Sequence, residues 1–103
     1  MVHNEVMNID ITIHQLCGGK INRLVAMLAA HSFLSGKTDL MFQFKGSPKA
    51  NRVRIELSPS DTYAVTFYAG RGVKVREVKS FAMVYGDQLR GLFENFTGLR
   101  TAL

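Results

Sequence analysis

The sequence RVRIELSPSDTYAVTFYA, residues 52–69, predicts two β-strands joined by a tight turn. In its first half, apolar residues alternate with charged ones, which is the two-residue period of a strand with one face in a core. The turn residues SPSD follow, with Asp61 placed to hydrogen-bond its own backbone. The predicted core residues of the two strands are Val53, Ile55 and Leu57, then Tyr63, Val65, Phe67 and Ala69.

The preceding residues extend this pair into a sheet. LMFQFK, residues 40–45, alternates in the same way, and GSPKAN supplies the turn before Arg52. After Ala69, Gly70, Arg71 and Gly72 predict a three-residue hairpin loop, since glycine allows the positive φ that such loops need. A last strand then runs from residue 73 to about residue 84.

The predicted hairpin fixes a register for the last two strands. It pairs Ala69 with Val73 and turns Glu77 toward the core, so we expect a bulge near Glu77 and Val78 that resets the alternation. On the outer face it sets Tyr68 beside Lys74, and Thr66 beside Arg76. The four strands together predict an antiparallel meander.

Helical patterns flank the strands. Residues 12–15, TIHQ, fit a capping box, and Gly18 and Gly19 end the short helix. KINRLVAMLAAHSFLSG, residues 20–36, predicts a second helix over about 22–33, with a buried strand over 24–27 as the competing interpretation. A final helix starts near Asp87, which either caps it or complements its dipole, and carries one apolar stripe, Leu89, Leu92, Phe93, Phe96 and Leu99.

These elements predict one α+β domain over residues 1–103, with residues 1–9 as a frayed lead-in. Its four-stranded sheet carries the C-terminal helix on one face. The apolar tail TGLRTAL extends the stripe through Leu99 and Leu103. We expect these two leucines either to fold back onto the sheet or to form an oligomer contact, as in a homodimer, because an exposed apolar tail favours aggregation.

The charge of the chain is uneven. Its 103 residues include 13 Lys or Arg and 8 Asp or Glu, a net charge of +5, which favours contact with polyanions. The excess lies between residues 45 and 79. One interpretation is a solvated sheet face whose cations prevent edge pairing. The other is a surface that contacts nucleic-acid phosphates and stacks an unpaired base, with the candidates Lys45, Arg52, Arg54, Tyr68, Arg71, Lys74 and Arg76.

Catalytic and metal patterns are weak. CGGK, residues 17–20, lacks the glycine spacing and the hydroxyl residue of a phosphate loop. Cys17 and His14 could formally pair as nucleophile and base, but a lone thiol is more often a small core residue. The three histidines have no metal-ligand spacing. We therefore expect no enzyme, no metal and no cofactor. No membrane span or secretory signal is expected either, which predicts a cytoplasmic protein.

Several short motifs resemble a group of small uncharacterised phage and plasmid proteins. They are QL-GG (residues 15–19), AM (26–27), VRIEL (53–57), DTYAVTF (61–67), RG (71–72), DQL (87–89) and TGLRTAL (97–103). The likeness spans residues 15–103 and is most specific at 61–67 and 97–103. Relatives tend to have Thr-Gly where this chain has Leu28 and Ala29. The resemblance implies a mobile-element accessory protein in a bacterial cytoplasm and implies no catalytic activity.

Two functions fit these observations. The first is a non-enzymatic nucleic-acid binder that uses the basic sheet face and the Gly-Arg-Gly loop, for DNA or RNA alike. The second is an anti-CRISPR-like inhibitor that binds a host defence protein complex through protein–protein contacts. The two differ in their expected response to salt, because phosphate binding weakens steeply as ionic strength rises.

Overall fold

A five-stranded antiparallel sheet forms the centre of the structure, a computed structural model that describes residues 7–101. Every strand pairs with the strand that follows it in the chain, which makes the sheet a meander. The α+β class and the antiparallel meander are confirmed, whereas the prediction of four strands was wrong. The strands are β1 (His31–Ser35), β2 (Asp39–Gln43), β3 (Arg52–Leu57), β4 (Tyr63–Ala69) and β5 (Arg76–Val84).

The three central strands follow the predicted alternation. Val53 and Ile55 of β3 and Val65 and Phe67 of β4 are fully buried, and the residues between them are partly exposed. Directly opposed residues of antiparallel strands share a face of the sheet, so these residues give the central strands one apolar face. None of the helices formed by residues 7–101 lies on the other face.

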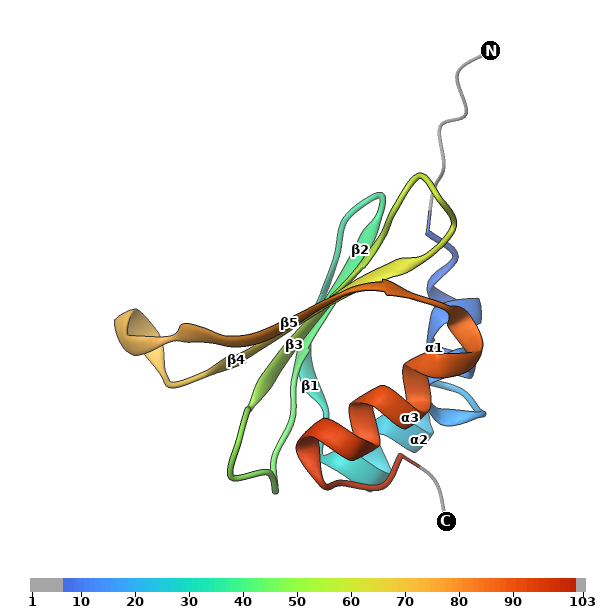
Figure 1. Ribbon diagram of the computed structural model, residues 1–103. Coiled ribbons are helices and arrows are strands. Elements are labelled where there is room, and N and C mark those ends of the chain that lie inside the picture. The colour runs from blue at the N-terminus through green and yellow to red at the C-terminus, as the bar shows by residue number, and fades with distance from the viewer. Residues whose placement is uncertain (1–6, 102–103) are drawn as a thin grey trace.

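Three helices cover the apolar face: α1 (Ile9–Cys17), α2 (Ile21–Leu28) and α3 (Gly86–Thr97). Figure 1 shows all three on the same side of the sheet, while the β4–β5 hairpin extends beyond them. The predicted stripe of α3 is confirmed, with Leu89 and Phe93 buried and the other three members packed at the edge of the core. Helix α3 starts near Asp87 as predicted: Tyr85 is the N-cap, and Asp87 lies in the first turn, where its charge complements the helix dipole.

The predicted helix over residues 22–33 was wrong in its second half, and the competing strand over 24–27 was also wrong. Helix α2 ends at Leu28 because Ala29 adopts a left-handed conformation, with φ 52° and ψ 38°. The chain then turns into β1, where Phe33 packs against Phe42 with ring centroids 5.3 Å apart. This strand lies at the edge of the sheet and supplies the fifth strand.

The conformation of Ala29 leads to a stability prediction. Non-glycine residues lose about 1 kcal/mol or more in the left-handed region, whereas glycine tolerates it. We expect Ala29→Gly to stabilise the fold by about 0.5–1 kcal/mol, after the greater freedom of glycine in the unfolded chain is subtracted. Urea unfolding monitored by circular dichroism measures the change. Ala26→Gly, inside α2, is the control and should destabilise by a similar amount; destabilisation by both variants would contradict the assignment.

The predicted capping box at residues 12–15 was wrong. Helix α1 begins earlier, with Asn8 as its N-cap, and the Ile11 backbone N–H donates to Asn8 Oδ1 at 3.2 Å. Thr12 and Gln15 instead bind the buried hydroxyl of Tyr63. That hydroxyl lies 3.0 Å from Thr12 Oγ1 and donates to Gln15 Oε1 at 2.7 Å. Thr12 and Gln15 therefore join helix α1 to the sheet and do not cap the start of the helix.

The predicted register of the β4–β5 hairpin was also wrong. Ala69 lies opposite Arg76, not Val73, and the connection includes a short 3-10 turn at Gly72–Lys74. The expected bulge is present: Tyr68 pairs with Glu77 and Phe67 with Lys79, so Val78 has no directly opposed partner. The bulge directs Glu77 to the outer face. Because the loop is longer than predicted, the residues of β5 pair with other residues of β4 than expected.

The chain after α3 folds back onto the same protein. Gly98 ends the helix in the left-handed conformation, and Leu99 packs at the edge of the core. The backbone N–H and the hydroxyl of Thr101 both donate to Glu94 Oε2, at 2.8 and 2.9 Å. Partial burial alone would raise the pKa of Glu94, but these hydrogen bonds and the charge of Arg90 outweigh it and lower that pKa. Leu103, the other expected oligomer contact, lies outside the described residues.

Candidate nucleic-acid interface

The outer face of the sheet is not uniformly basic. Arg54, at its middle, donates from Nε to Asp39 Oδ2 at 3.0 Å, and its Nη2 lies 3.4 Å from Glu56 Oε2. The hydrogen bond to Asp39 raises the pKa of Arg54, with burial opposing the shift and Glu56 adding to it. Two carboxylates thus neutralise one of the predicted phosphate-binding residues. The prediction missed this pairing because Asp39 and Arg54 come from different strands.

The corrected register moves other candidates off this face. Arg76 lies opposite Ala69, so it shares the face that carries the helices. Lys74 lies in the exposed 3-10 turn at the tip of the hairpin. Tyr68 remains on the outer face, opposite Arg52 on one side and Glu77 on the other. The expected neighbours of Tyr68 and Thr66 were therefore wrong.

The remaining three cations meet at one end of the sheet. Lys45, Arg52 and Arg71 line a hollow of about 850 Å³ between the β2–β3 loop and the β4–β5 loop. We call this site the loop-end hollow. Its other lining residues include His31, Gln43 and Asn51, together with the glycines of both loops, and none of the described residues that line it is acidic. It combines positive charge with polar groups in a concave, solvent-accessible place, which favours an anionic ligand.

Hydrogen bonds hold both walls of the hollow. Asn51 Nδ2 donates to the Gly70 carbonyl at 2.9 Å and so ties the β4–β5 loop to the start of β3. Ser47 Oγ donates to the Thr97 carbonyl at 2.8 Å, which fixes the β2–β3 loop to the end of α3. The Lys45 backbone N–H donates to Leu28 O at 2.9 Å. The cationic side chains of the hollow therefore extend from backbone segments that hydrogen bonds hold in position.

Gly70 is required by the shape of the β4–β5 loop. Its φ is 112°, a conformation that L side chains rarely adopt. A Cβ at this position would also meet the backbone carbonyl of Lys74. This glycine lets the chain turn sharply enough to bring Arg71 back toward the hollow, so the Gly-Arg-Gly sequence has a structural reason beside any functional one.

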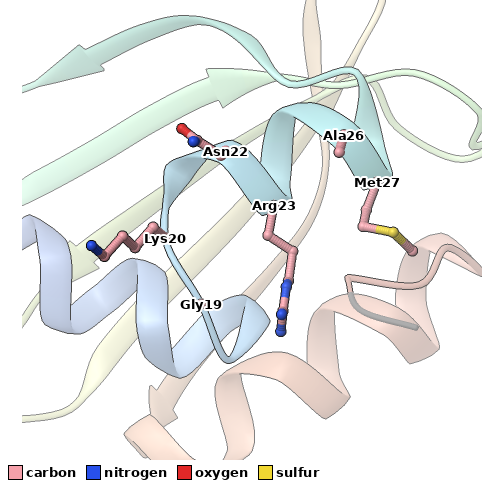
Figure 2. A pocket seen from close by; sticks show the side chains of 6 residues that line it. All are labelled: Gly19, Lys20, Asn22, Arg23, Ala26 and Met27. Carbon is pink, nitrogen blue, oxygen red and sulfur yellow. The ribbon is translucent and has the colours of Figure 1, made fainter.

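A second basic cavity lies on the helical side of the sheet and was not predicted from the sequence. Gly19, Lys20, Arg23 and Met27 line a cavity of about 490 Å³ beside α2. In Figure 2, Arg23 and Met27 extend from α2 toward α3, whereas Lys20 points away from them. The Arg23 guanidinium donates to the carbonyls of Cys17 at 3.3 Å and Gly18 at 3.5 Å. Arg23 is thus engaged at the end of α1, a structural use that leaves this cavity the weaker candidate.

The formal catalytic pair is separated by burial. Cys17 is fully buried and its thiol donates to the Ile13 carbonyl at 3.2 Å, while His14 is exposed. Among residues 7–101, no group of three or more His, Cys, Asp or Glu side chains is arranged to hold a metal ion. The same residues include no helix that is long and apolar enough to cross a membrane.

Comparisons with known protein families, with curated proteins and with solved structures gave no match to this chain.

Proposed function

We propose that the protein binds nucleic acid, and that the loop-end hollow is where its cations contact the phosphates. The observation that supports the proposal is the convergence of Lys45, Arg52 and Arg71 on a hollow whose described lining has no carboxylate. Basic side chains that neutralise phosphates release condensed counterions, and this release drives association. The proposal does not depend on Arg54, Lys74 or Arg76, which were candidates from the sequence.

The polarity of the outer face supports this location. Asp39 of β2 lies directly opposite Glu56 of β3 at one end of this strand pair, whereas Gln43 and Arg52, at the other end, line the hollow. Arg54 offsets only one of these two negative charges, so a phosphate near the carboxylates would be repelled. A polyanion is therefore directed to the loop end of the face.

Binding should depend strongly on salt. For about three phosphate contacts, the slope of log affinity against log salt should be about −2 to −3. Fluorescence anisotropy with labelled DNA and RNA oligonucleotides, titrated at several salt concentrations, measures it. Lys37→Glu, in the exposed turn between β1 and β2, should leave the slope unchanged. Absence of binding to every oligonucleotide at low salt would refute the proposed function.

A second candidate function is that of a mobile-element protein that inhibits a host defence protein. It is favoured by Leu34 in the edge strand β1, which is 68% exposed and lies directly opposite Met41 of β2. Exposed apolar residues of this kind are typical of protein contacts when they form a patch. A host protein that is retained in a pull-down after nuclease treatment would support this candidate.

A further inference from the structure

A row of cross-strand neighbours leads out of the loop-end hollow over the outer face. His31 of β1 lies opposite Gln43 of β2, which lies opposite Arg52 of β3, which lies opposite Tyr68 of β4. Three of the four, His31, Gln43 and Arg52, also line the hollow. A cation and an amide are thus placed between two rings on one uncovered line of the sheet.

The dimensions of this row suit an extended chain. Adjacent strands lie about 4.8 Å apart, so the three spacings from His31 to Tyr68 cover about 14 Å. Stacked nucleotides of one strand rise about 3.4 Å each. The row is therefore long enough for more than one nucleotide, with a ring at each end and Arg52 between the rings.

The two rings are accessible to a base. His31 is exposed and Tyr68 is partly exposed, and His31 Nδ1 lies 3.0 Å from Ser32 Oγ, a contact that restrains the imidazole. Stacking on aromatic side chains requires bases that are free of a partner strand, whereas the bases of a duplex are covered by their own stack. A duplex would use the cations alone.

We infer that the ligand is a single-stranded nucleic acid that crosses the sheet along this row. Its phosphates occupy the loop-end hollow beside Arg52 and Arg71, and its bases stack on His31 and Tyr68. This inference rests on the proposed function and adds the strandedness of the ligand and the path it takes. Glu77, opposite Tyr68 on β5, marks the end of the path, because a carboxylate repels a further phosphate.

The test compares one labelled oligonucleotide of about 12 nucleotides, within the range of known single-strand sites, with its duplex form. We expect the single strand to bind at least about tenfold more tightly at moderate salt. Loss of a stacked base on alanine substitution corresponds to a roughly 5- to 150-fold loss of affinity. Because both rings are exposed at least in part, we expect Tyr68→Ala and His31→Ala each to weaken single-strand binding about fivefold.

The control variants separate this inference from the proposed function. Tyr68→Phe retains the ring and should bind like the wild type, and neither alanine variant should change duplex binding. Equal affinity for both forms, or unchanged single-strand binding in both alanine variants, would overturn the inference and leave the proposed function standing if Arg71→Glu still weakens binding. Failure of every oligonucleotide to bind would remove both. Thermal melting of each variant shows whether a loss reflects unfolding, and His31, at the exposed edge, provides a second position if Tyr68→Ala is unstable.

Discussion

Phe93→Ala should destabilise the protein by about 3–5 kcal/mol, the typical loss for a fully buried phenylalanine. Phe93 is 1% exposed and joins α3 to the sheet. Its ring centroid lies 5.1 Å from that of Phe44, 5.8 Å from that of Phe67 and 6.4 Å from that of Phe42. Removing the ring leaves a cavity among three others and also forfeits edge and tilted aromatic contacts.

Urea unfolding, followed by far-UV circular dichroism, measures this loss. Since small domains are stable by about 5–15 kcal/mol, the variant should unfold at much lower urea or be partly unfolded without it. Leu92→Ala is the matched control, because Leu92 lies on the same helix but is only partly buried. A loss below about 1 kcal/mol for Phe93→Ala would mean that α3 does not seal the core as described.

Reversing two charges in the loop-end hollow should have the largest effect on binding. Arg52→Glu combined with Arg71→Glu removes two cations and places two carboxylates where phosphates are expected. Exposed charge pairs contribute up to about 1 kcal/mol each, and reversal replaces attraction by repulsion. The double variant should therefore bind nucleic acid about 30- to 100-fold more weakly at low salt, and this difference should shrink as salt screens the charges.

The control for this variant changes the net charge equally at other places. Lys37 lies in the turn at the opposite end of the sheet, and Lys79 shares the helix-bearing face with Phe67. Lys37→Glu combined with Lys79→Glu should bind within about threefold of the wild type at moderate salt, since neither side chain lines the hollow and salt screens exposed charges over about 8–10 Å. Equal losses in both double variants would indicate a general charge effect without a site.

The alternation of apolar residues predicted the central strands, and the stripe from Leu89 to Leu99 predicted α3, because both elements bury one face along a regular period. The start of β1 could not be predicted in this way. The residues next to Ala29 include no glycine or proline, the residues that normally end a helix. Ala29 itself ends α2, in a left-handed conformation that alanine rarely adopts. Tertiary packing of Phe33 on Phe42 decides the outcome there.

The candidate site was predicted in composition but not in arrangement. Sequence reasoning placed Arg52 and Arg54 on one outer face, and the alternation of β3 agrees with that. It could not show that Asp39, from another strand, pairs with Arg54. The register of the last hairpin depended on a loop conformation with a 3-10 turn, and the wrong register placed Arg76 on the wrong face. His31 was missed because it was assigned to a helix.

The most direct measurement is nuclear magnetic resonance of the labelled protein during titration with a single-stranded oligonucleotide. If the loop-end hollow binds phosphates, the backbone amide signals that shift most should be those of Lys45, Gly46, Arg52, Arg71 and Gly72, which line it. The amide chemical shifts of α1 and of the β3–β4 turn should not change. Shifts concentrated around Lys20 and Arg23 beside α2, or no shifts at all in low salt, would contradict a binding site in the hollow.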